Sequence, residues 1–283
     1  MIKIENVEVM GWEHAIRGMR NPMNSWEKSD SKFCSEFALC EECPAFDADV
    51  PCQVINADPL AIGPNDHQLM MNLAHGGPVH AKYRRMITVY LDITAPLYWW
   101  KEFDTYKAGT VANSCSTMHK IHAKYFELSD FSHEHLLLPS KELLIETLKV
   151  LNRYRDLYLG YTGFESWACG PFDKKEYWHN MIQLLPTSYN QKRTVMLNYE
   201  VLAAMYESRK NHKLDEWREF CKWIESLPYS ELIIGEVTYV EPEPVVSKGD
   251  GPNGIVRTQE EIEADRKKLE KDAESIIYDL DNH

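Results

Sequence analysis

One stretch of the chain, Ala95–His119, constrains the fold more strongly than any other. Pro96 suits the first turn of a helix, because its missing backbone N–H would have no intrahelical partner there. Trp99 and Trp100 follow on that helix, and short hydroxyl and amide side chains then fill an expected polar turn over 108–117. Indole rings and short polar groups can bind a flat, polar ligand, but the same pattern is typical of a buried helix and its turn.

Apolar periodicity along the rest of the chain predicts a mixture of strands and helices, which defines an α+β protein. The stretch 13–60 looks irregular. Asn65 or Asp66 would cap the first long helix. The expected strands cover 1–12 and 86–93, and the expected helices cover 63–76, 80–85, 141–161, 174–184, 193–210 and 215–226.

The chain divides into three expected parts. Residues 1–60 form an N-terminal strand and a cysteine-containing irregular elaboration, and residues 61–235 form the main domain. The last part, 236–283, combines a Pro- and Gly-rich linker over 241–255 with a charged helical tail over 258–280.

Composition excludes several classes of function. The 283 residues are 44% hydrophobic and 27% charged, as in an ordinary globular protein. A net charge of −13 argues against sequence-independent nucleic-acid binding, although a few local cations can still hold one free nucleotide. No apolar run approaches the roughly 20 residues that a membrane span needs. We therefore expect a cytoplasmic protein with no membrane association.

Four of the seven cysteines cluster in the N-terminal elaboration. Cys34, Cys40, Cys43 and Cys52 have the spacing C-x5-C-x2-C-x8-C, and the close central pair is typical of zinc ligands. An iron–sulfur site is a second interpretation, and four unrelated free thiols are a third. The sequence leaves all three open.

A series of short motifs follows the same order as in one known family. A His75-Gly-Gly-Pro78-Val-His80 element precedes a strand, and the helix after that strand ends in Thr105-Tyr-Lys-Ala-Gly-Thr-Val-Ala-Asn-Ser-Cys-Ser-Thr-Met118. Asn198-Tyr-Glu200 and Arg209 come later. In this order and spacing, residues 72–230 resemble the flavin-dependent thymidylate synthases, also called thymidylate synthase complementing proteins.

The resemblance implies a fold, a cofactor and an assembly. The fold would be an antiparallel or mixed sheet flanked by helices, the cofactor FAD, and the assembly a homotetramer whose sites are shared between subunits. The residues implied at the nucleotide are Glu102, Tyr106, Lys107, Thr110, Ser116 and Arg209. The residues implied at the flavin are His75, His80, Asn113 and Asn198. For the two histidines and Tyr106, a structural role is an equally open interpretation.

The chain departs from the family where the family binds dUMP. The family's Arg-His-Arg is replaced by Thr105-Tyr106-Lys107, and Glu102 stands for its Gln. Glu200 replaces a further Arg, so that Arg209 alone keeps a family arginine. A lysine cannot reproduce the two-pronged phosphate contact of arginine, and a carboxylate accepts hydrogen bonds from an amino group rather than from uracil's carbonyl.

Two hypotheses about function follow from these departures. In the first, the protein is an enzyme-like relative that binds a flavin, a pyrimidine nucleotide or both, with a substrate other than that of dUMP methylation. In the second, it is a non-catalytic nucleotide-binding or oligomeric scaffold protein that keeps the fold. The basic cluster of Lys82, Arg84 and Arg85 could contact a phosphate, face solvent or pair with the acidic tail, and the sequence leaves these interpretations open.

Overall fold

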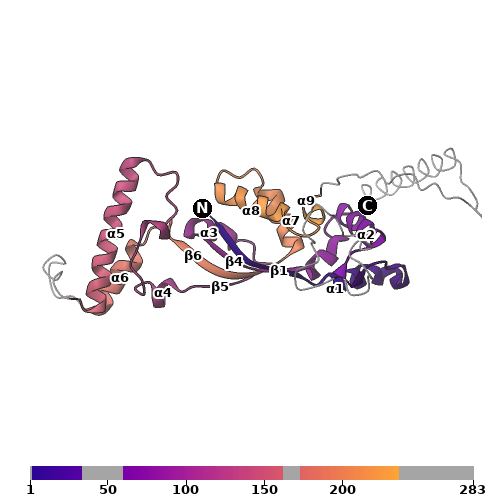
Figure 1. Cartoon of the computed structure of the whole chain (residues 1–283), viewed down its shortest axis with the longest axis horizontal. Helices are drawn as coiled ribbons and strands as arrows, with labels where there is room; N and C mark the ends of the chain where they lie inside the picture. The colour runs from indigo at the N-terminus through magenta and orange to yellow at the C-terminus, as the bar shows by residue number, and fades with distance from the viewer. Residues whose placement is uncertain (1, 34–59, 162–172, 236–283) are drawn as a thin grey trace, which may run out of the picture. The chain divides into compact units, whose positions relative to one another are not determined.

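The computed structural model describes residues 2–33, 60–161 and 173–235 (Figure 1). The four clustered cysteines, the linker over 241–255 and the helix expected over 258–280 all lie outside these ranges. The predictions made for them therefore stay predictions.

A four-stranded antiparallel sheet forms the centre of the described chain. Its strand order is β1 (Lys3–Met10), β4 (Thr88–Pro96), β6 (Asn190–Asn198) and β5 (Val111–Ser114). Every neighbouring pair in this order is antiparallel. The prediction of an α+β protein with an antiparallel sheet flanked by helices is confirmed.

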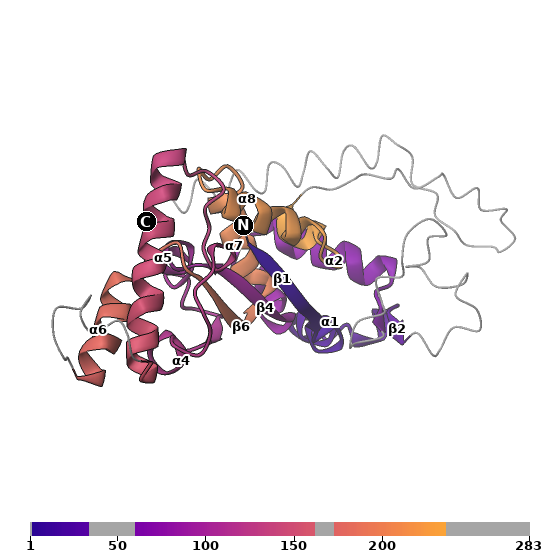
Figure 2. The ribbon, with the colours of Figure 1, turned by 60° about the vertical axis from the view of Figure 1, so that its left-hand side comes forward.

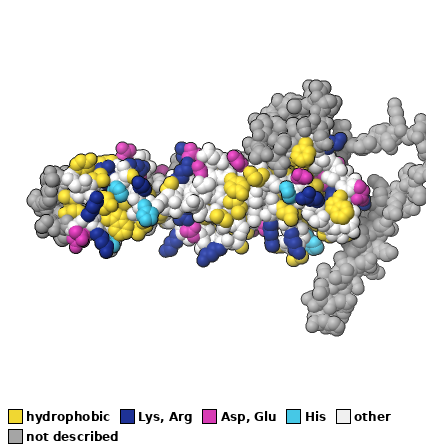
Figure 3. Space-filling model, turned by 90° about the horizontal axis from the view of Figure 1, so that it is seen from below, with side chains coloured by type: hydrophobic (Ala, Val, Ile, Leu, Met, Phe, Trp, Pro, Cys, Tyr) yellow, Lys and Arg dark blue, Asp and Glu magenta, His cyan; other side chains and the backbone are white. Residues whose placement is uncertain are grey.

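The sheet has one buried face and one open face. Val9, Val89 and Leu197 lie opposite one another on three strands and are at most 1% exposed. Their neighbours on the other face include Tyr90, which is 41% exposed. This alternation is the two-residue period of a strand with water on one side. Seen from below the view of Figure 1, hydrophobic side chains are exposed among Lys and Arg side chains (Figure 3).

Four helices pack against the buried face. They are α3 (Leu97–Phe103), α7 (Tyr199–Arg209), α8 (Asp215–Glu225) and α9 (Glu231–Ile234). Trp99 lies at their centre, fully buried, with its ring centroid 4.8 Å from that of Trp217 and 4.9 Å from that of Trp100. The interpretation of Trp99 and Trp100 as core residues is confirmed, so neither indole can stack on a ligand.

A second group of helices packs on the same core. It contains α1 (Trp12–Arg20), α2 (Pro64–His75) and the 3-10 helix η6 (Ala81–Met86). Between α1 and α2 lie the short elements η1 (Asn21–Met23), η2 (Trp26–Lys28), β2 (Lys32–Phe33) and β3 (Leu60–Ala61).

The prediction of an irregular stretch from residue 13 is wrong over α1. Trp12, Ala15, Ile16 and Met19 follow the helical period and are buried together. This apolar stripe is short and ends at the Asn21-Pro22 turn signal, which obscured the helix in the sequence.

The prediction of Asn65 or Asp66 as a helix cap is also wrong. Gly63 occupies the N-cap position of α2 without a side-chain bond. The carboxylate of Asp30 instead accepts hydrogen bonds from the backbone N–H groups of Asn65 and Asp66, at 2.8 and 3.0 Å. A cap supplied from another segment cannot be inferred from local sequence.

A second, smaller apolar cluster joins α5 (Leu138–Leu159) and α6 (Lys174–Leu184), which lie side by side in Figures 1 and 2. The short helices α4 (Thr117–Lys120) and η7 (Leu128–Asp130) precede them. Buried Asn152 fixes the chain before η7, because its side chain bonds both the N–H and the carbonyl of Phe126, at 2.8 and 2.9 Å.

Two other element predictions are wrong. The helix expected over 193–210 starts only at Tyr199, because residues 190–198 form β6. The polar turn expected over 108–117 contains β5, which pairs with β6 at the sheet edge. Among the described helices, none combines the length and apolarity needed to cross a membrane.

Candidate functional site

A cavity of about 710 Å³ lies where η6, the loop after α3 and the first turn of α7 meet. We call it the α7 cavity. It is lined by Arg85, Thr105, Tyr106, Lys107, Ala108, Gly109, Asn198, Glu200, Val201 and Ala204.

The loop over 104–110 gives the α7 cavity its shape. Gly109 has φ +80°, and a Cβ atom there would lie 2.5 Å from Nδ2 of Asn198, so only glycine fits. Asn198 caps α7 by accepting the N–H of Val201 at 2.9 Å. The hydroxyl of Thr110 donates to the carbonyl of Tyr106 and ties the loop to itself.

Both signs of charge line the α7 cavity. Arg85 and Lys107 are exposed cations, whereas Glu200 supplies a carboxylate at the start of α7. Oε2 of Glu200 is buried. It lies 3.7 Å from Nη1 of Arg84, which is too far for a hydrogen bond. That oxygen and Nε of Arg84 are both buried without a hydrogen-bond partner.

A polar cluster lies on the other side of Tyr106. Arg209 bonds Oε2 of Glu102 at 2.8 Å through Nη1 and the hydroxyl of Tyr106 at 3.0 Å through Nε. Glu102 also accepts from Nε1 of Trp217 at 3.1 Å, and His212 lies 3.4 Å from the same carboxylate. The guanidinium carbon of Arg209 lies 4.8 Å from the Trp217 ring centroid. The charges of Glu102 and Arg209 therefore neutralise each other within the protein.

The structure brings together part of the predicted site. Tyr106, Lys107 and Asn198 line the α7 cavity, and Glu102 and Arg209 form the adjacent ion pair. Thr110 does not line the cavity, but its hydroxyl donates to the carbonyl of Tyr106, which does.

The other predicted residues lie elsewhere. Ser116 caps α4 by accepting the N–H of His119 at 3.0 Å, and it lines a separate cavity of about 560 Å³. Asn113 is exposed on the edge strand β5. His75 is exposed at the end of α2, and His80 lines a third cavity of about 550 Å³.

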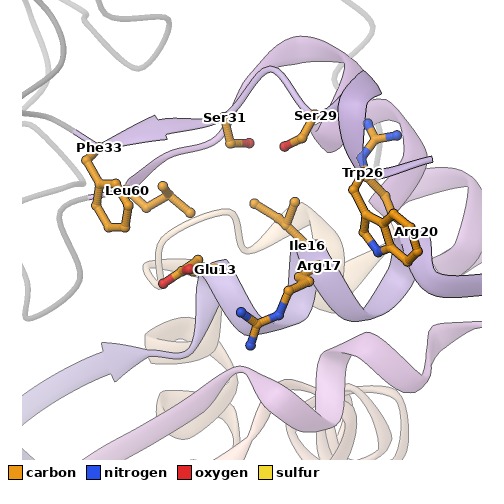
Figure 4. A pocket seen from close by; sticks show the side chains of 9 residues that line it. All are labelled: Glu13, Ile16, Arg17, Arg20, Trp26, Ser29, Ser31, Phe33 and Leu60. Carbon is orange, nitrogen blue, oxygen red and sulfur yellow. The ribbon is translucent and has the colours of Figure 1, made fainter. Parts of the chain in front are cut away.

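A smaller hollow of about 320 Å³ lies beside α1, with Phe33 and Leu60 at one end and Trp26 at the other (Figure 4). Buried Arg20 lines it and donates to Oδ1 of Asp66 at 2.6 Å. Burial raises the pKa of Asp66, but hydrogen bonds from Ser29, Ser31 and Arg20 outweigh it, so the pKa lies below its ordinary value. The hollow contains none of the residues predicted at the site.

Three features of the site escaped the sequence interpretation. Trp217 and His212 complete the Glu102 cluster from α8 and from the loop before it. The sequence shows Glu200 as the replacement of an arginine, but only the fold places its carboxylate in the cavity. The two consecutive arginines were visible as a basic cluster, but only the fold separates Arg85, in the cavity, from Arg84, behind Glu200. Within the described ranges no group of His, Cys, Asp and Glu could hold a metal ion.

Comparison with known proteins places this geometry in a known fold. No protein-family model and no curated protein matches the sequence. Among solved structures, the flavin dependent thymidylate synthase ThyX from Helicobacter pylori, complexed with FAD and dUMP, aligns with a TM-score of 0.52 and 13% identity. The alignment covers 82% of this chain and 99% of that chain.

A second structure of the same enzyme with FAD and dUMP also gives a TM-score of 0.52 and 13% identity, over 83% of this chain and 98% of that chain. The UMP/dUMP methylase PolB from Streptomyces cacaoi, bound with 5-Br dUMP, gives a TM-score of 0.44 at 10% identity, over 80% and 89% of the two chains. That lower score adds nothing to the fold assignment. The described chain therefore has a fold similar to that of ThyX, and the likeness extends to the fold alone.

Proposed function

We propose that this protein is a divergent relative of the flavin-dependent thymidylate synthases. It binds a flavin, a pyrimidine nucleotide or both in the α7 cavity, and it acts on a substrate other than dUMP. The α7 cavity is the observation that carries the proposal. It lies at the segment that resembles the family motif, and the ThyX structures of similar fold hold FAD and dUMP.

The side chains of the α7 cavity suit a flat ring with a phosphate. Tyr106 offers an aromatic ring, and Arg85 and Lys107 offer cations on two different elements. Arg209 is unsuited to hold the phosphate while Glu102 neutralises it at 2.8 Å. The replacement of the family's Arg-His-Arg by Thr105-Tyr106-Lys107 supports a reaction different from that of the family. The proposal also includes assembly of the protein as a homotetramer whose sites are shared between subunits.

Binding of FAD and dUMP to the full-length protein tests the proposal. Lys107→Ala and Arg85→Ala should each weaken phosphate-ligand binding about tenfold in isothermal titration calorimetry, because each removes one charge-assisted contact. Lys101→Ala is the matched control, since Lys101 is exposed on α3 and does not line the cavity. If neither ligand binds at millimolar concentration, and purified protein carries no flavin absorbance, the binding proposal fails.

The Glu102–Arg209 ion pair also favours a second candidate, a non-catalytic scaffold that keeps the fold for assembly. Native mass spectrometry of freshly purified protein separates the two. A flavin adduct supports the first, whereas an oligomer without flavin supports the second. The same spectra show whether Cys34, Cys40, Cys43 and Cys52 hold zinc, hold an iron–sulfur cluster or remain free thiols.

A further inference from the structure

Glu200 is the one carboxylate that lines the α7 cavity within the described ranges. It occupies the second position of α7, and its side chain is 21% exposed. The nearby Glu102 does not line the cavity, and its Oε2 already contacts Arg209 at 2.8 Å, Trp217 at 3.1 Å and His212 at 3.4 Å. A ligand that needs a hydrogen-bond acceptor from a carboxylate would therefore find it at Glu200.

The carboxylate of Glu200 is poorly satisfied by the protein. Its buried oxygen has no hydrogen-bond partner, and the nearest cation atom, Nη1 of Arg84, is 3.7 Å away. Because that oxygen is buried, a ligand reaches Glu200 through the exposed part of its side chain, which lines the α7 cavity.

We propose that Glu200 accepts a hydrogen bond from an amino group on the bound base, so that the α7 cavity selects an amino-bearing pyrimidine nucleotide over a uracil nucleotide. The inference rests on nucleotide binding in this cavity as proposed above. Cytosine presents an N–H donor at the ring position where uracil presents a carbonyl oxygen, which a carboxylate repels. The phosphate then lies toward the two cavity cations, Arg85 and Lys107, and away from Glu200.

The discriminating pair of ligands is dCMP and dUMP, which differ at this ring position. Calorimetric titration of the full-length protein should show dCMP binding at least about tenfold more tightly than dUMP. A difference of this size is expected when one hydrogen bond replaces a repulsive contact. Glu200→Gln should bring the two affinities within about threefold, because an amide can turn to donate or to accept. Circular dichroism checks that the variant remains folded.

Glu207→Gln is the matched control. Glu207 lies on the same helix and pairs with Lys210 at 2.9 Å. The Glu207 side chain is 76% exposed and does not line the cavity. It should leave the dCMP preference unchanged.

The outcomes separate this inference from the proposal beneath it. Equal or tighter binding of dUMP to the wild-type protein overturns the inference and leaves nucleotide binding standing. A dCMP preference that survives in folded Glu200→Gln shows that another group reads the base, and also overturns it. Binding of FAD but of neither nucleotide overturns the inference alone. Failure of FAD, dUMP and dCMP together overturns the proposed function as well.

Discussion

At the scale of single residues, two arginines of the described chain are each held by a carboxylate. Arg209, the arginine predicted at a nucleotide, is neutralised by Glu102. Arg20, at 5% exposure, is held by fully buried Asp66. Asp66 also accepts from the hydroxyls of Ser29 and Ser31, each at 2.6 Å, so a single carboxylate joins α1, α2 and the loop between them.

Asp66→Asn tests the importance of that carboxylate. The substitution leaves buried Arg20 without its counter-charge and should lower the free energy of unfolding at pH 7 by about 3 kcal/mol, measured by urea denaturation. Glu146→Gln is the control, since it removes only an exposed partner of Lys149 and should cost about 0.5 kcal/mol or less.

The effect of Asp66→Asn should depend on pH in one direction. The folded-state pKa of Asp66 lies below the ordinary 3.8, so ionised Asp66 contributes stability above pH 3.8 and loses it as pH falls through the lowered value. The difference in free energy of unfolding between the wild-type and variant proteins should therefore be largest near neutrality and shrink as the pH falls below 3.8. A difference that stays constant on acidification would contradict this role.

At the scale of elements, the junction between β6 and α7 shapes the candidate site. Asn198 ends the strand, caps the helix through Val201, and packs against the loop at Gly109. Because the loop approaches Asn198 so closely, the cavity wall and the helix start depend on each other.

Two glycines with similar backbone angles isolate that close approach. Gly109 and Gly160 have φ +80° and +88°, but an added Cβ meets Asn198 at Gly109 and nothing within 4 Å at Gly160. Gly160→Ala should cost about 1 kcal/mol from backbone strain alone. Gly109→Ala should cost more, and it alone should weaken ligand binding in the α7 cavity. Equal losses in thermal unfolding for the two variants would contradict the contact.

At the scale of the whole molecule, the described chain has two apolar clusters. One lies between the sheet and its helices, and includes Leu91 at 1% exposure. The other joins α5 and α6 around fully buried Leu151. Separate clusters predict separate stability, because local unfolding follows contiguous cores.

Hydrogen exchange read by mass spectrometry tests this division. Leu91→Ala should lower the free energy of unfolding by about 2–5 kcal/mol and reduce protection across the sheet. Leu151→Ala should reduce protection mainly in α5 and α6, and Ile145→Ala, at 37% exposure on α5, should change little. If Leu151→Ala deprotects β4 as much as α5, the two clusters form one cooperative unit.

The elements that the sequence predicted well were those with a strong local signal. α2, α6 and α8 follow apolar periodicity and end at or within two residues of glycine, proline or a charged residue. β6 was missed because it runs directly into α7 with no glycine or proline between Asn190 and Arg209, so no turn signal separates the strand from the helix. β5 was missed because four exposed residues at a sheet edge carry no apolar alternation.

The sequence by itself determined the α+β class and the segment where the candidate site lies, because these depend on hydrophobic periodicity and on motif order along the chain. Only the tertiary structure decided which of the predicted polar residues meet. It engaged Glu102 with Arg209, left Glu200 in the α7 cavity, and placed Ser116 and His80 at other cavities. Pairing of charges depends on distances between residues far apart in the chain, and local sequence carries no record of those distances.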